Sequence, residues 1–142
     1  KLYLEYADRA NNWDLVDLSA PKILGQWMLV PSKIENRVAI LDKLAESDVL
    51  WHQRIAMVST WKTTQAGDPT FAMRYAERLV NHPHDLMHKA VGWMLREMGS
   101  RVDMDLLRDF LEEHYSEMSR TTLRYAIEKM DERERKEWLT RK

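Results

Sequence analysis

The chain has 142 residues, of which 44% are hydrophobic and 32% are charged, and this composition predicts a single globular domain over residues 1–142 rather than a disordered protein. Its 22 basic and 23 acidic residues nearly balance, so the net charge does not indicate a nucleic-acid partner. A balanced net charge is still compatible with one basic face. The absence of cysteine excludes disulfides, thiol catalysis and thiolate metal sites, and no apolar run approaches the roughly 20 residues of a transmembrane helix.

Helix signals dominate the first half of the sequence. The whole chain has only four glycines and four prolines, too few for many strands and turns. Ser19 and Pro21 predict the start of one helix, and Ser32 with Glu35 has the capping-box spacing of the next. Helices are predicted over residues 33–45, over 49–65 with Ser47 or Asp48 as N-cap, and over 70–81 with Asp68 and Pro69 at the start.

The second half continues the helical pattern after a break at Pro83. A helix is predicted over residues 84–99, where Gly99 is the expected C-terminal stop. Two more follow over 103–118 and over 119–130, the latter capped by Ser119. In the charged end of the chain, Asp131 stands three residues before a glutamate, which is again a capping-box spacing. We therefore expect about eight helices and no strand.

Two segments of the chain echo each other. Trp51 and Arg54 stand three apart, and Trp93 and Arg96 repeat that spacing 42 residues later. The fragments RIA, RYA, KAV and RYA also recur, each with a long basic side chain near an alanine. A period of about 40 residues in an all-helical chain is typical of HEAT-like helical hairpins stacked into a solenoid. One helix of each hairpin would then line a concave face where partners bind.

The stretch "NNWDLVD" contains a tryptophan and a carboxylate, Trp13 and Asp17. At a spacing of four they share one helix face, with their Cβ atoms about 5–6 Å apart. Spacing alone leaves two interpretations open. Either Trp13 belongs to the core while Asp17 caps the next helix, or both side chains act on one ligand.

Arg54 and Trp93 also allow two interpretations each. Arg54 directly precedes the apolar run 55–58, so it is either a snorkelling or ion-paired arginine or a phosphate contact, for which its forked donors are suited. Trp93 follows Gly92, and a glycine inside a helix costs about 1 kcal/mol relative to alanine. Such a glycine permits the close approach of a helix or of a ligand, so Trp93 is either a core residue or part of a site.

A histidine cluster raises the question of a metal site. His84 and His88 stand four apart, with Asp85 between them and His82 upstream. The HExxH pattern is absent and no third ligand is evident, so exposed histidines and no metal site are expected. The sequence also has no glycine-rich phosphate loop and no serine nucleophile motif.

Four segments together resemble a known family. "NNWDLVD", "LWHQRIAMVSTW", "KAVGWMLREMG" and "SRTTLRYAIEKM" are similar, in this order, to the signature segments of the AlkD-like DNA glycosylases, the HEAT-like-repeat members of the DNA alkylation repair family. The resemblance covers about residues 3–138. It implies an all-α fold, a right-handed superhelical solenoid of HEAT-like helical hairpins, whose concave basic face grips duplex DNA containing alkylated purines.

The resemblance also implies an activity, namely hydrolysis of the N-glycosidic bond of N3- and N7-alkylated purines. Asp17 matches the family's catalytic carboxylate, Trp13 and Trp93 match its two site tryptophans, and Arg54 matches its phosphate-contacting arginine. An alkylated purine is already cationic and leaves without an acid, while a carboxylate stabilises the oxocarbenium-like sugar and orients water. Indole faces favour the same cation.

Several further expectations follow from the resemblance. The enzyme needs no lysine Schiff base, metal or organic cofactor, and so should be a monofunctional, monomeric glycosylase in the bacterial cytoplasm at the nucleoid. Gln53 stands where the family often has a second basic residue, which predicts weaker binding of the DNA backbone. Because the family is longer at its N-terminus, we expect this chain to be a fragment that lacks the first repeats. A non-catalytic HEAT-like nucleic-acid-binding module and a protein-interaction scaffold remain the alternatives.

Overall fold

The computed structural model of the chain describes residues 34–141, and side chains from residue 38 onward. In this part of the chain there are seven α-helices, one short 3-10 helix and no strand. The helix predicted from Pro21 and the predicted cap at Ser32 lie outside the described residues. None of the helices described combines the length and the apolar character needed to cross a membrane. The elements are α4 (Ile34–Glu46), α5 (Leu50–Gln65), α6 (Thr70–Leu79), α7 (Asp85–Arg101), α8 (Met104–His114), η3 (Tyr115–Glu117), α9 (Arg120–Ala126) and α10 (Glu132–Thr140).

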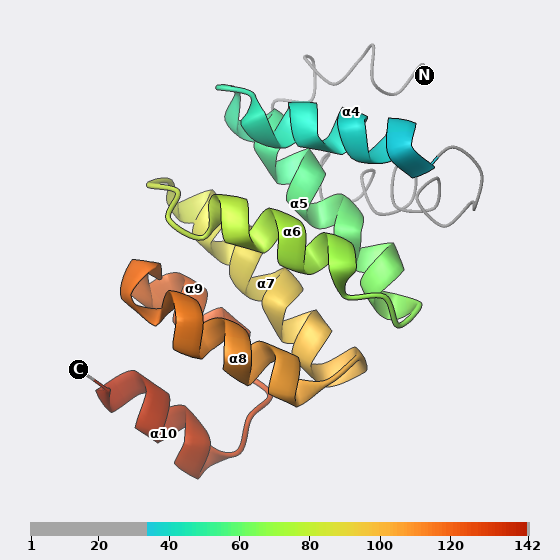
Figure 1. Ribbon diagram of the computed structural model, residues 1–142. Helices are drawn as coiled ribbons and strands as arrows, with labels where there is room; N and C mark the ends of the chain where they lie inside the picture. The colour runs from blue at the N-terminus through green and yellow to red at the C-terminus, as the bar shows by residue number, and fades with distance from the viewer. Residues whose placement is uncertain (1–33, 142) are drawn as a thin grey trace.

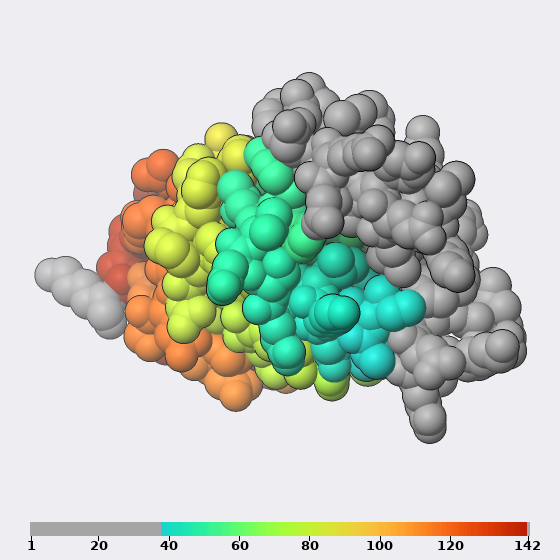
Figure 2. Space-filling view, turned by 90° about the horizontal axis from the view of Figure 1, so that it is seen from above, coloured from blue at the N-terminus to red at the C-terminus, as the bar shows by residue number. Residues whose placement is uncertain are grey.

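Six of the helices form three consecutive pairs in two layers. We call α4, α6 and α8, the first helix of each pair, the first layer, and α5, α7 and α9 the second layer. In Figure 1 the first layer lies in front, with α5 and α7 crossing behind it. Within the second layer α7 packs against both α5 and α9, and it also contacts α6 and α8. Figure 2 shows the pairs following one another along the molecule in sequence order.

The helix pairs recur at a shorter interval than the tryptophan echo predicts. Helices α5, α7 and α9 begin at Leu50, Asp85 and Arg120, so successive second-layer helices start 35 residues apart. The structural counterpart of Trp51 is therefore Leu86, not Trp93. The predicted period of about 40 residues is therefore wrong. Its two tryptophans are not equivalent, because Trp51 is the second residue of α5 and Trp93 is the ninth residue of α7.

Several predicted helix ends are confirmed, and others shift. Ser119 accepts a hydrogen bond from the Thr122 backbone at 3.1 Å, as expected of an N-cap, and Asp131 accepts one from Glu134 at 2.8 Å. Helix α5 instead has Val49 as its N-cap residue, with no side-chain cap. Ser47 accepts from the Val49 backbone at 3.1 Å just before the helix.

Gly99 does not stop α7, contrary to its predicted role. The helix continues to Arg101, and Gly99 is a buried residue inside it. A Cβ atom there would lie 2.7 Å from Cδ2 of Leu107, in α8. The glycine therefore serves helix packing, which a sequence pattern cannot distinguish from a C-terminal stop.

A similar glycine sets the distance between two second-layer helices. A Cβ atom on Gly92 would lie 2.5 Å from Cβ of Tyr125 and 2.8 Å from the carbonyl oxygen of Thr122, both in α9. The close approach expected of this glycine is thus an approach of one helix to another. Around it, the core is apolar and rich in methionine, with Met87, Met94 and other fully buried side chains lying between the layers.

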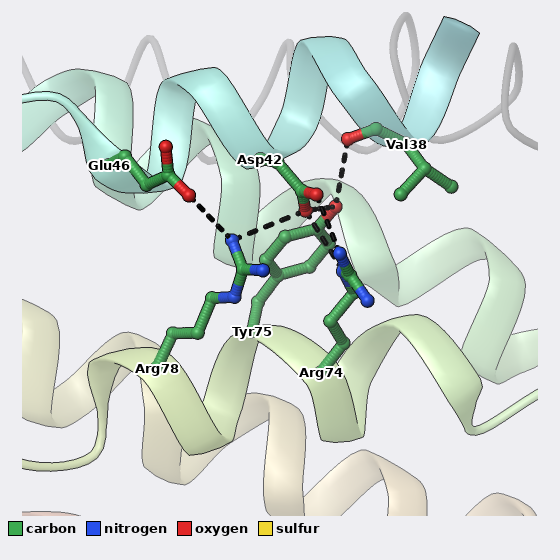
Figure 3. Close-up of polar contacts among 6 residues, drawn as sticks. All are labelled: Val38, Asp42, Glu46, Arg74, Tyr75 and Arg78. Atoms are coloured by element: carbon green, nitrogen blue, oxygen red, sulfur yellow. Dashed lines mark hydrogen bonds and ion pairs between the residues drawn. The ribbon is translucent and has the colours of Figure 1, made fainter. Parts of the chain in front are cut away.

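A polar network joins the first-layer helices α4 and α6 (Figure 3). Asp42 accepts two hydrogen bonds from Arg74, at 2.9 and 2.6 Å, and one from the Tyr75 hydroxyl at 2.9 Å. Arg78 adds an ion pair with Glu46 at 3.2 Å. The hydrogen bond from Arg74 holds the pKa of Asp42 below its ordinary value, and burial raises the pKa of Tyr75. Asp42 is therefore a charged anchor between two helices.

Candidate nucleic-acid interface

The four predicted site residues divide into two groups. Trp13 and Asp17 lie outside the described residues, so their roles stay predictions. Arg54 and Trp93 lie on the neighbouring second-layer helices α5 and α7. Only the second pair can be placed in the fold.

Arg54 lies in the contact between α5 and α7. It is 4% exposed, and its Nη1 donates a hydrogen bond to the backbone carbonyl of Leu86 in the first turn of α7. Burial of an arginine is costly unless its donors are used, and this contact uses a carbonyl near a helix start. The side chain therefore links the two helices, and the phosphate contact assigned to it by resemblance stays a prediction.

Trp93 lies two helical turns along α7 from the carbonyl that Arg54 contacts. Residues seven apart on an α-helix share a face, and the rise of 1.5 Å per residue separates Leu86 from Trp93 by about 10 Å. Trp93 is partly buried and packs against the core. Partial burial is compatible with both interpretations of Trp93, and its role at a site stays a prediction.

Charge is sorted between the two layers. The second-layer helices carry seven lysines and arginines against two acidic residues, a formal excess of five positive charges. The first-layer helices carry five lysines and arginines against eight acidic residues, a formal excess of three negative charges. Helices α5 and α9 contain no acidic residue at all. A chain with a net charge of −1 thus contains one distinctly basic layer.

The histidines near the start of α7 are used in local structure. His84 accepts a hydrogen bond from the Leu86 backbone at 3.1 Å through Nδ1 and so caps the helix. His88 Nε2 lies 2.5 Å from the carbonyl oxygen of His82. Burial is the main cause of a lowered pKa at His82, with smaller effects of the two neighbouring histidines. Each histidine therefore has a local contact, and the predicted exposure is confirmed only for His84, since His82 and His88 are half-buried.

One other group of side chains has ligand atoms in proximity. Within residues 38–141, Glu77, Glu113 and His114 bring three such atoms within 4.8 Å of one another. Both carboxylates are exposed, and His114 already contacts Glu117 at 3.0 Å through Nδ1. Exposed acidic groups commonly lie together without an ion, and we assign no metal to this group.

Gln53 has a structural partner of its own. Its Oε1 lies 2.8 Å from Nε2 of His82, in the loop before α7. Because Nδ1 of His82 accepts from the His84 backbone at 3.0 Å, the neutral ring carries its proton on Nε2 and donates to Gln53. A lysine or arginine could not accept that hydrogen bond. Gln53, where the resemblance predicts a basic residue, is therefore suited to accept the hydrogen bond from His82.

Comparison with known proteins yields one match. The sequence matches the family described as "DNA alkylation repair enzyme" over residues 1–130. Neither a search of curated proteins nor a search of solved structures gives a significant match. The matched segment includes every described helix except α10 and contains all four predicted site residues. The chain belongs to the DNA alkylation repair enzyme family, for which DNA is the substrate.

Proposed function

We propose that the chain is the catalytic part of a monofunctional DNA glycosylase that hydrolyses the N-glycosidic bond of N3- and N7-alkylated purines in duplex DNA. The observation that carries the proposal is the family membership over residues 1–130, with the Trp13–Asp17, Arg54 and Trp93 positions all inside the match. The basic second layer supports it, because a polyanion is attracted to a layer with an excess of five positive charges.

The proposed fold is the AlkD-like superhelical solenoid of HEAT-like hairpins. Three helix pairs that recur every 35 residues support it, as does the packing of each second-layer helix against the next. A second layer of this kind would line the concave side and face the duplex. The expected monomeric state and the cytoplasmic location belong to the same proposal.

In the proposed reaction the cationic purine leaves without protonation, and the positive charge develops on the deoxyribose. Asp17 stabilises that charge and orients the attacking water, whose proton it can accept. Trp13 and Trp93 pack on the sugar, where their ring faces favour the developing cation. Arg54 holds a neighbouring phosphate and keeps the strand in register. The reaction forms no covalent enzyme intermediate, so the strand is left uncut.

The test is release of free alkylated base from a methylated duplex under single-turnover conditions. Asp17→Asn should slow release by at least 100-fold while leaving affinity for the duplex within a few-fold of the parent, since removal of one electrostatic stabiliser costs about 10²–10³ in rate. Asp14→Asn is the matched control, because Asp14 is an acid in the same short segment. Equal rates for Asp17→Asn and the parent would refute the assignment of Asp17.

Base release by the protein also decides against the alternatives. A non-catalytic nucleic-acid module would bind the duplex with a steep salt dependence and release no base. A protein-interaction scaffold would show no binding of DNA at any salt concentration.

A further inference from the structure

A basic residue stands at the same place in every second-layer helix. Arg54, Lys89 and Arg124 are each the fifth residue of α5, α7 and α9, and they are therefore 35 residues apart in the chain. Packed helices lie about 8–10 Å apart, so equivalent positions on successive helices form a row with roughly that spacing. We call these three residues the basic row.

The two end members of the row, Arg54 and Arg124, lie toward a helix further along the chain. Arg54 donates to the Leu86 carbonyl of α7, one helix further on. Arg124 lines a surface hollow that it shares with α10 residues such as Glu132 and Lys136. The two ends of the row therefore point the same way along the chain, while Lys89 contacts Asp85 of its own helix. Access to water increases along the row, from the buried Arg54 to Lys89, whose side chain is 42% exposed, and to the exposed Arg124.

The other basic residues in the middle of this layer are engaged with carboxylates. Arg96 pairs with Glu128, and Arg101 bonds Glu97 at 2.6 Å. Lys89 differs because its partner in a 3.4 Å ion pair, Asp85, is exposed, whereas Glu97 is buried. Such pairs contribute little to stability. Within residues 38–141, Arg124 forms no ion pair. These two cations are thus available for an outside anion at small cost.

The row also passes the candidate site. On α7, Lys89 lies three residues after Leu86 and four before Trp93, so all three share one face of the helix. Lys89 therefore stands between the point that Arg54 contacts and the tryptophan predicted to pack on the sugar. An anion bound by Lys89 would be a near neighbour of that sugar.

We propose that Lys89 and Arg124 bind backbone phosphates of one DNA strand, which crosses the second layer along the basic row. The proposal rests on the proposed function in taking duplex DNA as the partner. Consecutive phosphates of a strand advance by about 3.4 Å along the duplex axis, so cations roughly 8–10 Å apart can reach separate phosphates of one strand. The row holds and orients the duplex and reads no bases, because phosphate contacts carry no sequence information.

The experiment measures the salt dependence of binding to an unmodified duplex, by fluorescence anisotropy at several salt concentrations. Each neutralised phosphate contributes about 0.9 to the slope of log K against log salt. Lys89→Gln and Arg124→Gln should each make the slope shallower by about 0.9, and the double variant by about twice that. Lys43→Gln is the control, because Lys43 is an exposed cation of the first-layer helix α4 and should leave the slope unchanged.

Three results would overturn the proposal: an unchanged slope in the double variant, an equal effect of Lys43→Gln, or no salt-dependent binding by the parent protein. Far-ultraviolet circular dichroism is the check that the variants remain folded. Single-turnover base release from an alkylated duplex, run alongside, separates this proposal from the proposed function. No release with the expected slope changes would refute the glycosylase and leave the row intact. Release with unchanged slopes would refute the row alone.

Discussion

Gly92→Ala should destabilise the protein although it places a better helix former inside α7. The new Cβ atom would lie 2.5 Å from Cβ of Tyr125 and 2.8 Å from the carbonyl oxygen of Thr122. Neither atom is the far end of a flexible side chain, and the carbonyl belongs to the backbone of α9. The contact can be relieved only by moving one helix away from the other.

The expected size is the difference of two effects. Alanine removes a helix-propensity penalty of about 1 kcal/mol. Overpacking of a filled interface costs about 1–3 kcal/mol, and a backbone obstacle favours the upper part of that range. The net loss should be about 1–2 kcal/mol, which for a chain of this length lowers Tm by roughly 3 °C per kcal/mol.

Urea unfolding followed by circular dichroism measures this loss, and Gly99→Ala provides the comparison. A Cβ atom on Gly99 would meet Cδ2 of Leu107 at 2.7 Å, Cβ of Leu107 at 3.1 Å and Sδ of Met104 at 3.2 Å, and the nearest of these is the end of a flexible side chain. This variant should lose less stability than Gly92→Ala. If Gly92→Ala were as stable as the parent, the glycine would not set the distance between α7 and α9, and the reasoning would be refuted.

Three more predictions concern the polar contacts. Asp42→Asn should lower the free energy of unfolding by about 1–2 kcal/mol near neutral pH, a figure reduced because the Arg74 side chain is 40% exposed. Because the folded state holds the pKa of Asp42 below 3.8, the difference from the parent should shrink only as the pH falls below 3.8, which urea unfolding at pH 7 and well below pH 3.8 will test. Burial lowers the pKa of His82, so the folded state resists protonation of this histidine and the parent should lose stability as the pH falls below about 6.5. His82→Gln should make this loss of stability with falling pH less steep, and an equally steep loss in the variant would contradict the reasoning. Arg108→Met removes hydrogen bonds of 2.7 and 2.9 Å to Glu134 in α10. Amide hydrogen exchange should therefore become faster in α10 while α5 and α7 keep their protection, and equally faster exchange in all three helices would show that α10 does not unfold independently.

Much of the helical organisation could be predicted from local chemistry. The caps at Ser119 and Asp131 depend on side chains that bond their own helix, so sequence spacing is sufficient to find them. The role of Gly99 could not be predicted, because a glycine that admits α8 and a glycine that ends a helix look alike in a sequence. The predicted repeat length of about 40 residues was also wrong, because it was taken from two similar Trp–Arg pairs and not from the helix starts, which are 35 residues apart.

The candidate site and a basic face were both predicted from family resemblance, but the helices that carry the positive charge were not. The net charge of the chain does not reveal that basic residues gather on the second-layer helices and acidic residues on the first-layer helices. The fragments around Arg54, Lys89 and Arg124 were visible as a recurring pattern. Their common register required the helix starts, because only then does each become the fifth residue of its helix. Arg74 shares the local pattern but belongs to the first layer, where it binds Asp42.

The separation of charge between layers gives these six helices a dipole moment that their small net charge does not reveal. In the field of a polyanion, a dipole experiences a torque, and this torque rotates the positive layer toward the source. Rotation of this kind occurs before contact, within the range set by the Debye length of about 8 Å at physiological salt. The protein would therefore meet a nucleic acid with its second layer facing inward more often than random tumbling allows, and it would do so without accumulating the net positive charge that causes indiscriminate adhesion.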